Sequence, residues 1–174
     1  MTKTRVIIMW GIITGVVEII FYQLLNLSGN TSGGLQSISY LILLGGLIGG
    51  MMQFRNKVNG GYATFGELYK VGMLMTLILS VITVAHLLIY MQINPGFIDK
   101  ILDQARVNMV NKGMTDDQIK MGMHYTQMFT TPLMMSIFGF IGNIIGGAIL
   151  GLLAAGILAK QKPFMEEDNN TLPS

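Results

Sequence analysis

The chain has 174 residues, which fits one domain, and 51% of them are hydrophobic while only 11% are charged. Soluble domains carry about a quarter charged residues, so this composition, with a mean hydropathy of +0.56, indicates a membrane protein. A net charge of +2 is too small to indicate a nucleic-acid binder, and the absence of cysteine excludes disulfides, thiolate catalysis and thiolate metal sites.

Four apolar segments predict four membrane-spanning helices, at about residues 6–27, 38–54, 65–91 and 132–158. The first segment could also be a signal peptide. It is too long for that, lacks a small-residue cleavage site and contains Glu18, so we expect a retained span. The sequence therefore predicts an all-α integral membrane protein whose single domain covers residues 1–162.

One face of the first span combines glycines with an acid. Gly11, Thr14, Gly15 and Glu18 share this face within about 100° of arc. Small residues allow a neighbouring helix to approach closely, so the Glu18 carboxylate points toward another helix. An ionised carboxylate is costly at that depth, so Glu18 is expected to be protonated, hydrogen-bonded or in contact with water.

Glycines recur at helical spacing in the second and last spans as well. The second span, of about 17 residues, holds two overlapping G-x-x-x-G registers, and this length is short for a bilayer. Such registers favour close helix packing without proving dimerisation. The predicted packing glycines are Gly11, Gly15, Gly45, Gly46, Gly49, Gly50, Gly142, Gly146, Gly147 and Gly151.

The third span carries a polar stripe at steps of three or four residues. Thr76, Ser80, Thr83 and His86 fall on this stripe, and most of the leucines lie off it. Such a helix has a lipid-facing side and a side that faces protein or water. His86 could relay protons or sense pH, but a hydrogen-bonded packing histidine is the favoured interpretation.

The polar segment at residues 94–130 predicts an amphipathic helical hairpin outside the bilayer. Asn94 and Pro95 are typical of an N-cap followed by the first helical position, and Gly113 of a helix end. Thr115 and Gln118 have the spacing of a capping box at the start of the second hairpin helix.

Metal and enzyme chemistry are weakly indicated. Met121, His124 and Met128 share one face of the second hairpin helix, and thioether and imidazole ligands suit Cu(I). Methionine is abundant throughout the chain and serves as pliable packing, so we predict no metal and no cofactor. The sequence has no phosphate-binding loop, nucleophile elbow or H-E-x-x-H motif, so we expect a non-enzymatic protein.

Basic residues predict the orientation. The first loop has none, and the four in the hairpin are balanced by four acids. The rule that cytoplasmic loops are rich in Lys and Arg therefore places both termini in the cytoplasm and the hairpin outside. The acidic tail at residues 163–174 is expected to be disordered and cytoplasmic. The basic residues that flank the cytoplasmic side are Lys3, Arg5, Arg55, Lys57, Lys160 and Lys162.

Four short motifs together carry a family resemblance. They are Gly60-Gly61-Tyr62 with Phe65-Gly66, Lys70-Val71-Gly72, Asn94-Pro95 with Phe97-Ile98, and Gly113-Met114-Thr115-Asp116-Asp117-Gln118-Ile119. With them, most of the chain, from the first span to Lys162, resembles domain-of-unknown-function family 4199. The resemblance implies a four-span bacterial inner-membrane protein and no particular activity. Family members are often encoded beside membrane-associated glycosyltransferases, which implies such an enzyme as a partner.

Two classes of function fit these patterns. The favoured one is a non-enzymatic membrane subunit or scaffold that binds other membrane proteins through its glycine faces and its hairpin. The alternative is a small oligomeric transporter or channel that uses Glu18 and the polar face of the third span. The favoured interpretation of Glu18 itself is structural: a buried, protonated carboxyl group that is hydrogen-bonded by Asn143 or by a hydroxyl of the third span. The candidate polar site comprises Glu18, Asn143, Thr76, Ser80, Thr83 and His86.

Overall fold

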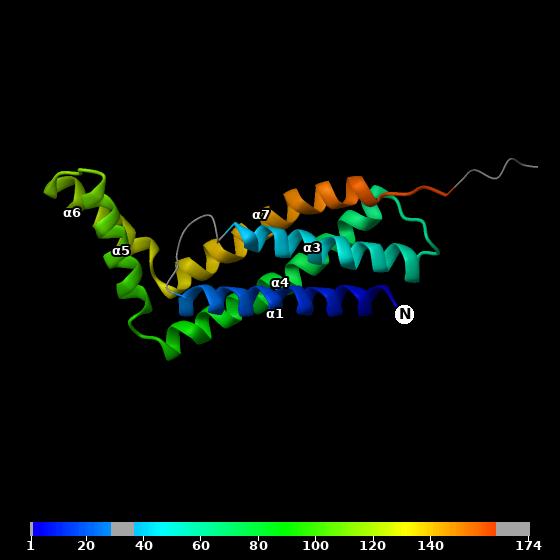
Figure 1. The fold of residues 1–174 in the computed structure, drawn as a ribbon, viewed down its shortest axis with the longest axis horizontal. Helices are drawn as coiled ribbons and strands as arrows, with labels where there is room; N and C mark the ends of the chain where they lie inside the picture. Colours follow the sequence, from blue (N-terminus) through cyan, green and yellow to red (C-terminus); the bar gives the residue numbers. More distant parts are fainter. Residues whose placement is uncertain (1, 29–36, 163–174) are drawn as a thin grey trace, which may run out of the picture.

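A computed structural model describes residues 2–28 and 37–162 of the chain (Figure 1). Most of the first predicted loop and the predicted tail at 163–174 lie outside these residues. The described part is helical throughout, with no strand, which confirms the predicted all-helical class. Its elements are α1 (Lys3–Ser28), α3 (Ile38–Gln53), the π-helical turn η1 (Phe54–Val58), α4 (Phe65–Ile93), α5 (Phe97–Asn111), α6 (Asp116–Phe129) and α7 (Pro132–Leu158).

Four helices form a bundle, and a hairpin projects from it. The helices α1, α3 with η1, α4 and α7 are each long and apolar enough to cross a membrane. Around the bundle, α4 packs against α1 and α7, and α3 packs against the same two helices. The chain runs back and forth, so Lys3, Arg55 and Lys160 come together at one end, here called the basic end. The α5–α6 hairpin extends beyond the other end, here called the hairpin end (Figure 1).

The basic end is held together by hydrogen bonds between the 59–64 loop and the end of α7. Ala63 and Lys160 exchange two backbone hydrogen bonds of 2.9 Å, and Arg55 Nη1 donates to the Leu158 carbonyl at 2.9 Å. A turn at Gly60 and Gly61 makes this possible, because both adopt positive φ angles (65° and 91°) that residues with a Cβ rarely adopt.

The second span is longer than its apolar segment predicted. The sequence placed its end near residue 54, but helical backbone continues through η1 to Val58. The Asn59 amide donates to the Phe54 carbonyl, which closes a wider π-type turn that carries Arg55 and Lys57. Hydropathy predicts only where the apolar side chains end. The helical backbone continues for one more turn, because its hydrogen bonds do not depend on apolar side chains.

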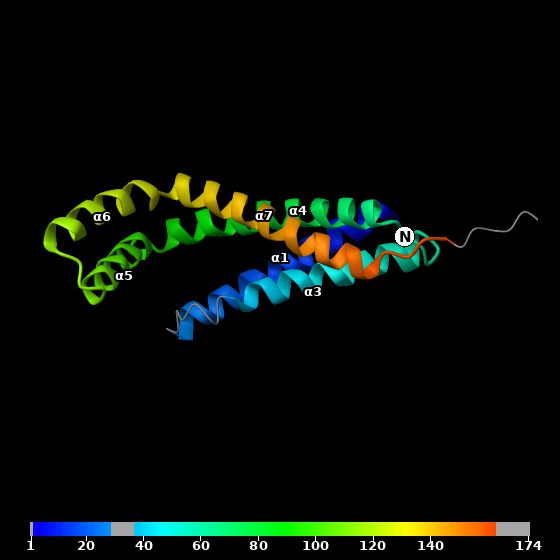
Figure 2. The same cartoon turned by 90° about the horizontal axis from the view of Figure 1, so that it is seen from above.

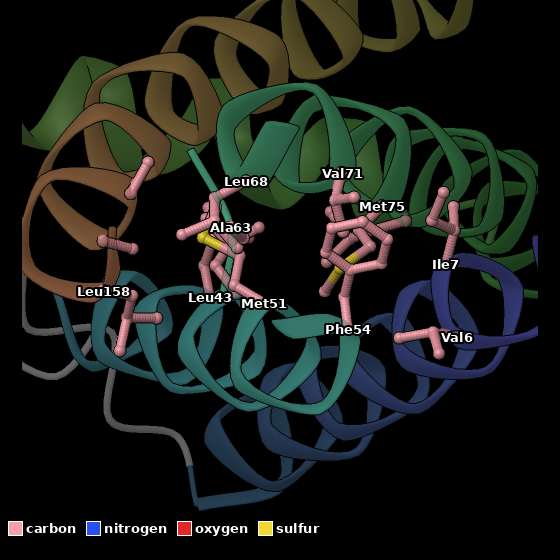
Figure 3. Packing of buried hydrophobic residues seen from close by; sticks show 14 residues of the cluster. Val6, Ile7, Leu43, Met51, Phe54, Ala63, Leu68, Val71, Met75 and Leu158 are labelled. Atoms are coloured by element: carbon pink, nitrogen blue, oxygen red, sulfur yellow. The ribbon is translucent and has the colours of Figure 1, made fainter. Parts of the chain in front are cut away.

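The hydrophobic core fills only the half of the bundle near the basic end. Figure 3 shows Leu68, Val71 and Met75 of α4 packed with Met51 and Phe54 from α3 and η1. Toward the hairpin end, α1 and α3 diverge from α4 and α7 (Figure 2). The buried core residues are Val6, Ile7, Leu43, Leu47, Met51, Phe54, Ala63, Leu68, Val71, Met75, Leu79, Ala154, Ala155 and Leu158.

Half of the predicted packing glycines lie where a side chain would collide with another helix. A Cβ at Gly46 would come within 2.9 Å of Thr14 Cβ, and a Cβ at Gly147 within 2.9 Å of Thr76 Cβ. These approaches bring α3 onto α1 and α7 onto α4, as small residues allow. The glycines with such an approach are Gly11, Gly46, Gly49, Gly50 and Gly147.

The other predicted packing glycines differ. Cβ atoms at Gly15, Gly146 and Gly151 would make ordinary van der Waals contacts of 3.5–3.6 Å. Nothing lies within 4 Å of the Cβ position of Gly45 or Gly142, so neither packs against another described helix of this chain. Each faces outward because each lies about 100° or more around its helix from the close-contact glycine of the same span.

The hairpin has well-defined helix ends but little contact with the bundle. Its two helices pack mainly on each other, and none of their residues is buried. The predicted capping box is confirmed, because the Gln118 amide donates to Thr115 Oγ1 and the Thr115 amide to Gln118 Oε1. Gly113 ends α5 at a positive φ of 71°, as predicted.

The predicted start of the hairpin is wrong by two residues. The N-cap of α5 is Gly96, and the helix begins at Phe97 rather than at Pro95. Asn94 is already the C-cap of α4, where its amide donates to the Tyr90 carbonyl. Its own carbonyl accepts from the Phe97 amide at 3.0 Å, so Asn94 and Pro95 form the turn between the helices.

Candidate functional site

A cavity of about 240 Å³, lined by both polar and apolar side chains, lies between the four bundle helices. Its lining residues come from all four helices and lie on the hairpin side of the buried core. Four of the six predicted polar-site residues line it, namely Glu18 from α1, Thr83 and His86 from α4, and Asn143 from α7. The complete lining is Glu18, Ile19, Tyr22, Ser39, Thr83, Val84, His86, Leu87, Gly139 and Asn143.

Thr76 and Ser80 do not reach the cavity. Both are fully buried in the packed half of the bundle. Thr76 Oγ1 donates to the Gly72 carbonyl at 3.0 Å, and Ser80 Oγ donates to the Thr76 carbonyl at 2.7 Å. Hydroxyls in helices often bond the carbonyl one turn back, and these two are thereby occupied inside α4.

Asn143 and Thr83 join α7 to α4 at the wall of the cavity. Asn143 Nδ2 donates to Thr83 Oγ1 at 2.9 Å, and Thr83 Oγ1 in turn donates to the Ser80 carbonyl at 3.2 Å. The sequence suggested that Asn143 or a hydroxyl of the third span bonds Glu18. In the structure, Asn143 and the Thr83 hydroxyl bond each other instead. Within the described residues, no hydrogen bond of the half-buried Glu18 carboxylate is found.

His86 is positioned by a residue that sequence reasoning missed. Its Nε2 lies 3.0 Å from Nε2 of Gln23 on α1. This hydrogen bond joins α1 to α4 beside the cavity. The sequence does mark Gln23, because it is a polar residue within an otherwise apolar helical segment. The bond lies off the glycine face, and only the tertiary arrangement reveals it.

Aromatic rings connect the cavity with the base of the hairpin. The His86 ring stacks on Tyr90 at 6.0 Å between centroids, and Tyr90 meets Tyr22 and Phe97 edge to face at 6.5 and 5.2 Å. A larger open hollow of about 1210 Å³ lies where α5 joins the bundle, and Tyr22 lines both this hollow and the cavity. The cavity therefore adjoins a wide opening on the hairpin side.

The methionine and histidine face of α6 lies away from this site. Met121, His124 and Met128 are all exposed on the hairpin. In the described chain, no three His, Cys, Asp or Glu side chains are grouped so that they could hold a metal ion. A carboxyl group, an imidazole and an amide around one cavity are instead groups that bind cations or exchange protons.

Comparison with models of known protein families identifies the family of this chain. The model of the family described as "Protein of unknown function (DUF4199)" matches residues 9–160, which is most of the chain. The chain belongs to the DUF4199 family. The match covers the bundle and the hairpin of this DUF4199 protein, and it confirms the resemblance seen in the sequence motifs. Searches of curated proteins and of solved structures found no match.

Proposed function

We propose that this DUF4199 protein is a non-enzymatic membrane subunit that binds another membrane protein through α6. Embedding in a bilayer is supported by the outward surface of the four long helices. Side chains such as Ile20, Val81 and Ile149 are more than half exposed although they are apolar. An apolar surface of this extent is stable in lipid and unfavourable in water.

The charge distribution supports one orientation of the bundle. Lys3, Arg55 and Lys160 lie at the basic end, with the two chain termini of the bundle. The preference of Lys and Arg for cytoplasmic loops therefore favours a cytoplasmic basic end and a hairpin outside. With the bacterial inner membrane that the family resemblance implies, the hairpin would be extracytoplasmic.

An exposed apolar stripe on α6 carries the proposal. Met121, Tyr125 and Met128 are 65%, 56% and 55% exposed, and their spacing of four and three residues puts them on one helix face. The helix packs on α5 and leaves this face uncovered by the described chain. Apolar anchors at this spacing typically dock a helix into a groove of a partner protein. A membrane-associated glycosyltransferase is the partner that the family resemblance favours.

Affinity purification in mild detergent with quantitative mass spectrometry tests this function. The Met121→Ser, Tyr125→Ser double variant should recover the partner at about tenfold lower yield or less, since aromatic anchors dominate such interfaces. Lys120→Ser, Gln127→Ser is the matched control, because both residues are polar and exposed on the same helix. Equal recovery of every membrane protein by the stripe variant and the wild type would exclude α6 as the docking element. A glycosyltransferase among the lost proteins would identify the partner class.

A small oligomeric transporter or channel is the second candidate, and the cavity that reaches Glu18 is the observation that favours it. The bundle beyond the cavity is filled by buried side chains such as Leu47 and Leu68, so this candidate requires the packed half to open. Proton or cation flux into liposomes would test it. Flux that disappears in Glu18→Gln supports transport, and identical flux in wild type, Glu18→Gln and empty liposomes rules it out.

A further inference from the structure

Several groups at the cavity can accept hydrogen bonds from a ligand. Asn143 donates from its amide nitrogen to Thr83 Oγ1, and its carbonyl oxygen is an acceptor at the cavity wall. The Thr83 hydroxyl is already committed to the Ser80 carbonyl. The Glu18 carboxylate adds two further acceptor oxygens. A ligand that carries hydrogen-bond donors and a positive charge is complementary to these acceptors.

The cavity also lacks an internal counter-ion. None of the 11 Lys and Arg residues of the chain lines it. A carboxylate in a low-dielectric site is stabilised strongly by a cation that arrives from outside the chain. Tyr22 lies one helical turn after Glu18 and lines the same cavity, so an aromatic ring stands beside the carboxylate. A carboxylate next to an aromatic ring is the arrangement that recognises organic ammonium groups.

The size and lining of the cavity favour an organic cation over a bare metal ion. Its volume of about 240 Å³ corresponds to roughly eight water molecules at about 30 Å³ each. Hard metal ions require several oxygen ligands at distances of about 2.0–2.6 Å. Among the described residues, Glu18 is the one carboxylate that lines this space, so a metal ion would lack a sufficient ligand set.

We propose that this cavity binds a small ammonium cation, with the Glu18 carboxylate as its counter-ion and the Tyr22 ring as its aromatic contact. The wide hollow at the base of the hairpin, which shares Tyr22, gives the ligand its route of entry. The ammonium belongs either to a free amine or to a lipid headgroup, because both present the same charged group. This site does not depend on the partner bound by α6, so it goes beyond the proposed function.

Binding to the purified full-length protein in nanodiscs of phosphatidylglycerol tests the site, because this lipid has no ammonium group. Methylammonium and ethanolamine are the free probes, and sodium is the comparison ion. We expect saturable binding of the ammonium probes and an affinity loss of about tenfold or more in Glu18→Gln, which removes the charge and keeps the shape. Glu67→Gln is the matched control. Glu67 lies at the basic end, where it forms a capping box with Thr64 at the start of α4, and glutamine can also serve in a capping box.

A second variant guards against a folding defect. Tyr22→Leu should weaken methylammonium binding while Glu18 remains, because it removes the aromatic face. Wild-type affinity in both folded variants, no saturable binding in the wild type, or equal binding of sodium would overturn the proposal. Phosphatidylethanolamine added to the nanodiscs distinguishes the sources. Competition with the free probe identifies a lipid headgroup, and its absence identifies a free amine.

Discussion

Gly147 of α7 lies directly against Thr76 of α4, so that a Cβ at position 147 would come within 2.9 Å of Thr76 Cβ. Thr76 is fully buried, and its hydroxyl is fixed by the Gly72 carbonyl. Neither helix can move away easily from an added methyl group, because α4 and α7 make the most extensive helix packing in the bundle. This approach sets the spacing of α4 and α7 on the packed side of the cavity.

The packing prediction compares two glycines of α7. Gly147→Ala should lower the free energy of unfolding by about 1–3 kcal/mol, the usual cost of overpacking, despite the better helix propensity of alanine. Gly142→Ala meets open space and should be neutral or stabilising by up to about 1 kcal/mol. Thermal unfolding in detergent measures both. Equal shifts in Tm would mean that Gly147 is not at a close contact.

The hydrogen bond between Asn143 and Thr83 should appear as a coupling energy. In a double-mutant cycle with Asn143→Leu and Thr83→Val, we expect a coupling of about 0.6 kcal/mol, and at most about 1.7, as measured for bonds between membrane helices. Glu18→Leu combined with Asn143→Leu should be additive, because Asn143 bonds Thr83. Coupling of Asn143 to Glu18 in place of Thr83 would contradict the structure.

The cap of α6 gives a local prediction. Thr115→Ala should destabilise the start of the helix by about 1 kcal/mol, because it removes the acceptor of the Gln118 amide. Hydrogen exchange of that amide in the full-length protein should accelerate. Gln127→Ala, an exposed position of the same helix, should leave it unchanged. An unaffected Gln118 amide in Thr115→Ala would show that the threonine does not cap α6 in solution.

The orientation prediction follows from the basic end. Reporter fusions at Asn59 and Gln161 should be cytoplasmic, and one at Lys112 in the hairpin should be extracytoplasmic. These positions sample both ends of the bundle (Figure 1). A cytoplasmic signal from the Lys112 fusion would reverse the topology.

Hydropathy and capping motifs predicted the helices well, because each depends on neighbours in the sequence. The Thr115 capping box and the Gly113 stop are local features of this kind. The continuation of the second span through Phe54–Val58 depends on a π-type backbone bond in a polar segment, and hydropathy carries no signal for it. The start of α5 was misjudged because Asn94 could cap either of two adjacent helices.

The sequence could predict which helix faces point inward, but it could not predict which of their residues line the cavity. Periodicity placed Thr76, Ser80, Thr83 and His86 on one side of α4, but it could not tell which of them lie at the open half of the bundle. That distinction arises where the helix pairs diverge, which is a tertiary property. The pairing of Asn143 with Thr83 likewise requires knowing that α7 is a neighbour of α4.

Cysteine accessibility tests most directly the contrast between a packed half and an open, polar half of the bundle. The chain has no cysteine, so a single introduced thiol reports its own position. Ser39 and Thr83 line the cavity, whereas Ser80, one turn from Thr83, is 0% exposed. A membrane-impermeant, positively charged thiol reagent added from the hairpin side should modify Ser39→Cys and Thr83→Cys and leave Ser80→Cys unmodified. Equal modification at all three positions, or reaction of Ser80→Cys alone, would contradict an open cavity bounded by a packed core.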